Sequence, residues 1–143
     1  MDDTAIKHLE FIQNIINRMA NNSFLLKGWN VTVSSAILML IVNDPKPLYM
    51  IIALFFSISL WGLDAYYLRQ ERLFRILYDD VRVRATMKKI RKNDVLGLDV
   101  DQYQAKVPGW FRTLWSGSLF WLHGMVVFIV VATIVVFLVY LQR

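Results

Sequence analysis

The sequence contains no cysteine and only two histidines, His8 and His123, which stand far apart in the chain. The lack of cysteine excludes disulfides, thiolate metal sites, iron–sulfur clusters and cysteine nucleophiles. Two separated histidines without clustered carboxylates do not make a metal site. There is also no glycine-rich phosphate loop and no G-x-S-x-G turn. We therefore expect a protein that is not an enzyme and that carries no cofactor.

Charge is also scarce. Charged residues make up 19% of the 143 residues, whereas hydrophobic residues make up 57%. This balance is outside the range of ordinary soluble domains and is typical of an integral membrane protein. Three apolar runs each have close to the ~20 residues that a helix needs to cross a bilayer. They occupy residues 23–42, 48–68 and 119–141.

A short break between the first two runs predicts a helical hairpin. Residues 43–47 read "NDPKP", and two prolines within five residues do not continue a helix. Both arms extend beyond the apolar runs, because residues 1–22 have the spacing of an amphipathic helix and residues 65–94 contain neither glycine nor proline. The extensions should pack a stripe of Ile6, Leu9, Ile12, Ile16 and Met19 against Phe74, Leu77 and Val81.

The positive charges predict how the spans are oriented. Residues 69–118 hold eleven lysines and arginines, whereas the turn holds only Lys46 and the end of the chain only Arg143. Loops rich in lysine and arginine stay in the cytoplasm, so the N-terminus should be cytoplasmic and the C-terminus should lie outside a bacterial inner membrane. We expect an all-α membrane protein with three transmembrane helices, the first two forming a long antiparallel hairpin that extends into the cytoplasm. Its predicted segments are an amphipathic helix (1–22), a first span (23–42), an outer turn (43–47), a second span (48–68), a cytoplasmic helix continuous with it (69–94), a connector with an interfacial part (95–118) and a third span (119–141).

The first two predicted spans contain one lysine and one carboxylate. Residues at equal distances from the middle of the turn lie at the same depth, and this places Lys27 level with Asp64. Opposite charges that meet in lipid avoid most of the cost that each would carry alone. The alternative is that each side chain turns separately to the nearby interface. Depth alone does not decide between an ion pair and this arrangement.

Small residues recur at the same depths in both arms. Side chains of this size, four residues apart, let helices approach closely in lipid. They could also line a water-filled path if several copies assembled. The candidates for packing or pore lining are Thr32, Ser35, Ala36, Ala53 and Ser57.

A basic surface follows the second span. We interpret it first as a determinant of how the spans are oriented in the membrane. The alternative is a surface that contacts anionic lipid headgroups or an acidic protein. We do not expect nucleic acid as a partner. The surface comprises Arg82, Arg84, Lys88, Lys89, Arg91 and Lys92.

Tryptophans gather at the predicted inner end of the spans. Indole rings favour the boundary between headgroups and hydrocarbon, so we interpret this belt as an anchor in the membrane. The belt comprises Trp29, Trp61, Trp110, Trp115 and Trp121.

Two stretches, "HLEFIQNIINRMANNSFLLKGW" and "WGLDAYYLRQERLFRILYDDVR", resemble a family of small bacterial membrane proteins that share this N-terminal half. The resemblance covers about residues 7–82 and brings no catalytic residue with it. Proteins of this kind are similar to effectors of bacterial anti-phage systems, which assemble on a trigger and permeabilise the inner membrane. The matching positions are Lys27, Gly28, Trp29, Asp64, Tyr67, Gln70, Glu71 and Arg72.

The resemblance implies a membrane-disrupting or pore-forming effector that is triggered through its cytoplasmic helices. A single hairpin buries little surface, so we expect a homo-oligomer in the lipid bilayer and a cytoplasmic protein as a possible trigger. The alternative is a non-conducting scaffold or accessory subunit of a larger membrane complex.

Overall fold

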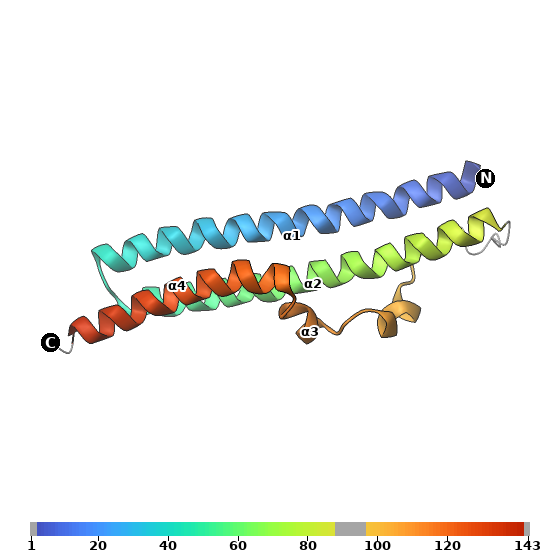
Figure 1. Ribbon diagram of the computed structural model, residues 1–143. Helices are drawn as coiled ribbons and strands as arrows, with labels where there is room; N and C mark the ends of the chain where they lie inside the picture. The colour runs from blue at the N-terminus through green and yellow to red at the C-terminus, as the bar shows by residue number, and fades with distance from the viewer. Residues whose placement is uncertain (1–2, 88–96, 142–143) are drawn as a thin grey trace.

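The computed structural model describes residues 3–87 and 97–141, and every regular element in these ranges is a helix. Three helices, α1, α2 and α4, are long and apolar enough to cross a membrane. Figure 1 shows α1 and α2 side by side along their whole length, with α4 against the half of α2 nearest the turn. The elements are α1 (Asp3–Asn43), α2 (Pro47–Thr86), η2 (Asp101–Lys106), α3 (Trp110–Leu114) and α4 (Gly117–Leu141).

The hairpin turn is as short as the sequence predicts. α1 ends at Asn43, and α2 begins at Pro47, where the missing N–H of proline costs nothing because the first turn of a helix has no acceptor for it. One unbroken helix therefore includes both the amphipathic start and the first apolar run. We call residues 3–22 and 69–87 the polar half of the hairpin, and residues 23–43 and 47–68 its apolar half. The helix expected to continue to residue 94 is described as far as Thr86, and residues 88–94 lie outside the described residues.

The polar half has its own hydrophobic core. The prediction that Ile6 packs in this core is wrong, because its side chain is 39% exposed. Phe74, which we also expected there, is only partly buried. The inward row of α1 contains Ala5 rather than Ile6, because neighbouring residues point about 100° apart on a helix. The same one-residue rotation places Leu73 inward on α2. The core comprises Leu9, Ile12, Ile16, Leu73, Leu77, Val81, Tyr103 and Val107.

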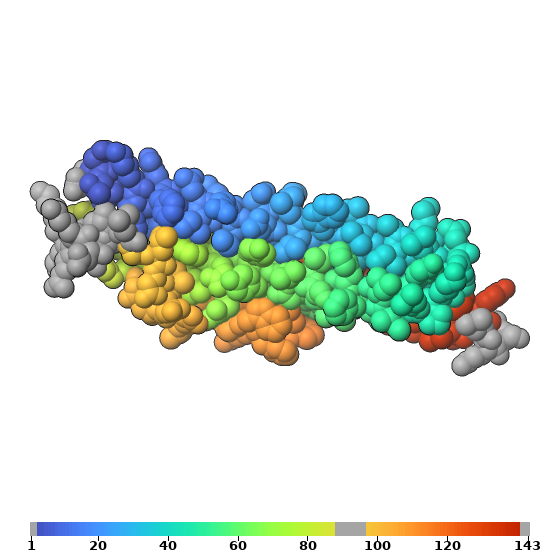
Figure 2. Space-filling model, turned by 180° about the vertical axis from the view of Figure 1, so that it is seen from behind, coloured from blue at the N-terminus to red at the C-terminus, as the bar shows by residue number. Residues whose placement is uncertain are grey.

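Residues 97–109, which we call the strap, cover part of this core. The sequence suggested only a connector here, but Tyr103 and Val107 are buried against the hairpin. Arg69 of α2 donates to the Oε1 atom of Gln104 at 3.1 Å and to the carbonyl of Pro108 at 3.3 Å. Figure 2 shows the strap lying against α2 on the rear face of the molecule. Part of the surface that we assigned to other copies is thus covered by the chain itself.

A tyrosine–carboxylate contact holds the strap. The Tyr103 hydroxyl donates to Asp80 Oδ2, and Arg84 donates to the same oxygen. Burial, followed by this hydrogen bond, raises the pKa of Tyr103 to about 12, and the bond lowers the pKa of Asp80. The contribution of Tyr103 to stability should be complete below about pH 10 and lost as the pH rises toward 12, because only the folded state then retains the proton. The contribution of Asp80 should be lost as the pH falls below its ordinary pKa of 3.8.

The Asp80→Asn variant should move the Tyr103 titration back toward its ordinary value. The phenolate absorbance of the wild type minus that of Tyr103→Phe isolates this titration. Asp79→Asn is the matched control, because Asp79 is 65% exposed and pairs with Arg82 instead. Equal shifts in the Asp79 and Asp80 variants would contradict the contact.

The end of the bundle nearest the turn is closed by apolar side chains. Ile41 of α1, Met50 and Ala53 of α2 and Val130 of α4 form one buried cluster. Outside this cluster, α4 exposes most of its apolar side chains, among them Phe128 and Val136. Such an exposed surface suits contact with lipid or with another apolar helix rather than with water.

Candidate functional site: a polar network between three helices

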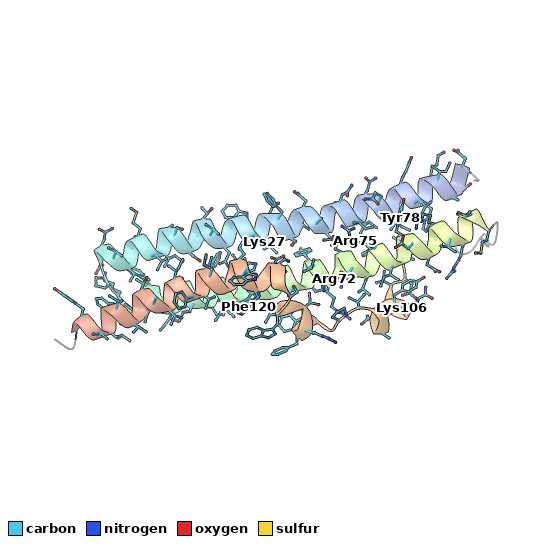
Figure 3. The ribbon with its side chains drawn as sticks, viewed as in Figure 1. Lys27, Arg72, Arg75, Tyr78, Lys106 and Phe120 are labelled. Carbon is cyan, nitrogen blue, oxygen red and sulfur yellow. The ribbon has the colours of Figure 1, made fainter. Side chains whose placement is uncertain are left out.

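A charged pair is buried in the apolar half of the hairpin. The Lys27 Nζ atom lies 2.7 Å from Asp64 Oδ2, and the two side chains are 21% and 0% exposed. Lys27 extends from the side of α1 that faces α2 (Figure 3). The two groups therefore meet across the hairpin instead of turning separately to an interface.

Ser23 completes the surroundings of the pair. Its hydroxyl donates to Asp64 Oδ1 and accepts from Lys27 Nζ at 2.7 Å. Both carboxylate oxygens of Asp64 thus have a donor. A buried ion pair is tolerated when further hydrogen bonds satisfy the remaining lone pairs, and Ser23 provides one of these bonds.

The third long helix joins the network through His123. Its Nε2 atom lies 2.8 Å from Asp64 Oδ2, and its Nδ1 atom lies 2.6 Å from the Asn30 amide nitrogen. His123 and Asn30 are both fully buried. Ser34 donates to Asn30 Oδ1 at 3.3 Å. Polar side chains of α1, α2 and α4 therefore form one continuous hydrogen-bonded chain.

Most of these partners were not among the residues that we expected at this site, although the sequence contains a signal for them. Ser23, Lys27, Asn30 and Ser34 follow one another at steps of four, three and four, which is the spacing of one helix face. A row of polar residues inside an apolar run points to an interface within the protein. From the sequence we considered His123 only as one of two separated histidines that do not make a metal site, and without a partner.

Aromatic rings hold His123 in place. The Trp61 ring is stacked on the imidazole at a centroid distance of 6.2 Å, and its N–H donates to the carbonyl of Leu114 at 3.0 Å. Trp110 of α3 donates in turn to the carbonyl of Gly62 at 3.0 Å. Trp61 is therefore more than the membrane anchor that the belt interpretation suggested. Phe120, labelled in Figure 3, contacts the Trp61 and Trp115 rings at the start of α4.

The small residues do not pack as the sequence analysis expected. Ala53 and Ser57 of α2 are fully buried, but Thr32, Ser35 and Ala36 of α1 are exposed. The distance of a residue from the turn determines its level in the hairpin but not the face of the helix on which it lies. The buried row of α1 contains Asn30 and Ser34, and Thr32 and Ala36 lie two residues away, which is about 200° around the helix.

The basic surface is described only in part. Arg82 lies 3.4 Å from Asp79, and Arg84 pairs with Asp80. Both arginines are thus partly neutralised by acids on their own helix. Lys88, Lys89, Arg91 and Lys92 lie outside the described residues.

The network has the chemistry of a proton or ion-pair site. Within residues 3–87 and 97–141, no group of three or more histidine, aspartate or glutamate side chains could hold a metal ion. The titratable groups that meet are an ammonium, a carboxylate and an imidazole, which can exchange protons and charge among themselves. Comparison of this chain with known proteins found no relative: no protein-family model, no curated protein and no solved structure matches it.

Proposed function

We propose that this chain is an oligomerising protein of the bacterial inner membrane that permeabilises the bilayer when its cytoplasmic part receives a signal. The observation that carries the proposal is a row of small, exposed residues on the outer face of α1. Gly28, Thr32 and Ala36 recur there at steps of four and are exposed. Spacing of this kind lets a second helix approach closely in lipid, where packing drives association. A second copy of α1 is the partner that this face fits.

Two hydroxyl groups on exposed surfaces are compatible both with lipid and with a water-filled path. Ser35 donates to the carbonyl of Val31 at 2.7 Å, and Ser59 donates to that of Phe55 at 2.7 Å. Bonds to the carbonyl four residues earlier satisfy a hydroxyl inside lipid. The same hydroxyls can turn toward water, so an assembly could use them along a polar path.

The strap offers a route for the signal. It is packed on the polar half through Tyr103 and Val107, and it leads through Pro108 and Gly109 directly into α3 and α4. A protein that displaced the strap would therefore pull on the helix that carries His123. In this proposal the polar half and the strap are cytoplasmic, as the distribution of basic residues predicts.

Single cysteines test the assembly, because the chain has no cysteine of its own. Under mild oxidation in native membranes, Thr32→Cys should form disulfide-linked dimers. Phe55→Cys is the control, since Phe55 is 73% exposed but lies on α2. Dimers at neither position, or equally at both, would contradict an interface on α1.

Permeabilisation needs its own measurement. Cells that overproduce the chain should take up a membrane-impermeant dye, because a high concentration favours assembly even without the signal. Thr32→Leu should reduce this uptake because a bulky side chain separates the helices, and Phe55→Leu should not. Dimers without dye uptake would favour the alternative, a non-conducting scaffold.

The scaffold has an observation in its favour. The apolar cluster around Ile41 and Val130 closes the bundle at one end, and the polar network ties all three long helices together. A bundle joined in this way suits a rigid subunit of a larger complex. The role in anti-phage defence is part of our proposal only through the resemblance of residues 7–82 to membrane-acting effectors.

A further inference from the structure

His123 is the branch point of the polar network, and both of its ring nitrogens have partners. Asn30 presents its amide nitrogen to Nδ1 at 2.6 Å, and an amide nitrogen only donates hydrogen bonds. Nδ1 must then accept, so the ring proton lies on Nε2 and is donated to Asp64 Oδ2 at 2.8 Å. Ser34 donates to the other end of the same amide. Every hydrogen bond in this arrangement is consistent with a neutral imidazole.

A proton on Nδ1 would reverse part of this chain. The protonated ring has two donors, and its Nδ1–H would meet the donor side of Asn30. The conflict disappears if the Asn30 amide rotates by half a turn, so that Oδ1 accepts from the ring and the amide nitrogen donates to Ser34. The Ser34 hydroxyl then has a carbonyl four residues earlier on its own helix as an acceptor. The network thus has a second complete set of hydrogen bonds.

Charge adds a second consequence. Asp64 Oδ2 is shared by Lys27 Nζ at 2.7 Å and His123 Nε2 at 2.8 Å. With a neutral imidazole the buried charges sum to zero, whereas a protonated imidazole leaves one positive charge in excess. Lys27 is the cation that can leave, because its side chain is 21% exposed while His123 is fully buried. The protonated ring, which already donates to this oxygen, would then be the cation paired with the carboxylate.

We propose that His123 is a reversible proton-binding site, and that proton uptake at Nδ1 rotates the Asn30 amide and releases Lys27 from Asp64. The proton comes from water at the polar end of the hairpin and returns there. No covalent bond other than N–H forms or breaks. The bound proton thereby breaks the ion pair between α1 and α2 and leaves the protonated imidazole of α4, which already donates to Asp64 Oδ2, as the cation paired with this carboxylate. This inference does not depend on whether the protein oligomerises.

No other described charge competes directly for the imidazole. Lys27 is the only charged residue of α1 between residues 23 and 43, and Asp64 is the only one of α2 between residues 47 and 68. Trp61, which is stacked on the ring, favours a cation over its face. Arg69 is bonded to the strap, and Arg112 of α3 is exposed.

Nitrogen NMR of the histidine side chains tests the proposal in the full chain. The chain is labelled with ¹⁵N-histidine and placed in lipid nanodiscs, and the loss of a signal in His8→Gln identifies His8. At high pH the His123 signals should show the neutral tautomer with its proton on Nε2. When the pH is lowered they should change to those of the doubly protonated ring, as expected for a reversible histidine site. The Nδ1–H tautomer, or a ring that stays neutral at every pH at which the chain remains folded, would overturn the proposal.

The exchange of cations has a matched pair of variants. Lys27→Met should raise the ratio of protonated to neutral His123 at a fixed pH by at least about tenfold, because a competing positive charge has been removed from the same oxygen. Lys46→Met, at the turn, should leave the ratio unchanged, since Lys46 pairs with Asp44. Equal ratios in the two variants would contradict the exchange. If Lys27→Met does not accumulate, the tautomer in the otherwise native network still decides the proposal.

Discussion

Replacing Asp64 with alanine should strongly reduce the amount of folded protein in the membrane. The change leaves the Lys27 ammonium without its carboxylate and removes the acceptor of both Ser23 and His123. Breaking a buried ion pair on one side typically costs about 3 to 5 kcal/mol. That is a large part of the total stability of a small domain. Thermal unfolding in detergent and the accumulated amount in membranes would both record the loss.

The double variant distinguishes an ion pair from two independent charges. Lys27→Ala should also destabilise the protein, because Asp64 is fully buried. The combined change should cost less than the sum of the two single losses, since it leaves no isolated charge in an apolar environment. Additive losses would show that the two groups contribute independently.

The turn provides a matched control for this cycle. Lys46 and Asp44 form a pair at 2.6 Å, close to the 2.7 Å of the buried one, but their side chains are 57% and 58% exposed. Alanine at either position should leave unfolding unchanged within error, because exposed pairs contribute little. A loss as large as that of Asp64→Ala would show that burial is not the cause.

The hairpin could be predicted from the sequence because local rules decide it. Two prolines in a five-residue break leave only an antiparallel connection, and the depth of each residue follows from its distance to the turn. This reasoning placed Lys27 and Asp64 at one level, where the structure has them in contact. It needed no information about the rest of the chain.

The faces of the helices were harder to predict, because an apolar helix has no polar side that marks its exterior. Thr32 and Ala36 have the right level for Ala53 and Ser57 but lie on the outer face of α1. In lipid, small residues are compatible with both an internal and an external contact. The buried polar residues Asn30 and Ser34 were the better guide to the inner face.

The third helix could be recognised from the sequence but not placed. A connector of more than twenty residues separates it from the hairpin, so no turn determines its position. Only the hydrogen bonds of His123 show which part of α4 faces Asp64 and Asn30. The strap had the same difficulty, since a glycine-containing segment has no periodic pattern that would reveal the burial of Tyr103 and Val107.

The network and the strap act on the same helix from two sides. The strap continues into α3 and α4, while His123 ties the beginning of α4 to α1 and α2. Trp61 connects the two, because its ring contacts His123 and its N–H binds the last residue of α3. A change in the polar half thus has a direct path of contacts to the polar network.

Ile12→Ala should open the polar half of the hairpin. Ile12 is fully buried among residues of α1, α2 and the strap, and truncating a buried isoleucine to alanine typically costs about 2 to 5 kcal/mol. Amide hydrogen exchange should therefore become faster in residues 3–22, 69–87 and 97–109. Exchange in the apolar half should change much less, because its contacts and its polar network remain.

Ile6→Ala is the matched control, since it makes the same chemical change on the same helix at a position that is 39% exposed. It should leave exchange in the polar half nearly unchanged, because an exposed side chain leaves no cavity when it is shortened. Equal effects of the two substitutions would mean that the buried row does not run through Ile12, and that the strap does not rest on a packed core. If Ile12→Ala alone makes exchange in the strap faster, the strap rests on this core. Because the strap continues into α3 and α4, α4 is then attached to a core that a substitution in α1 can open.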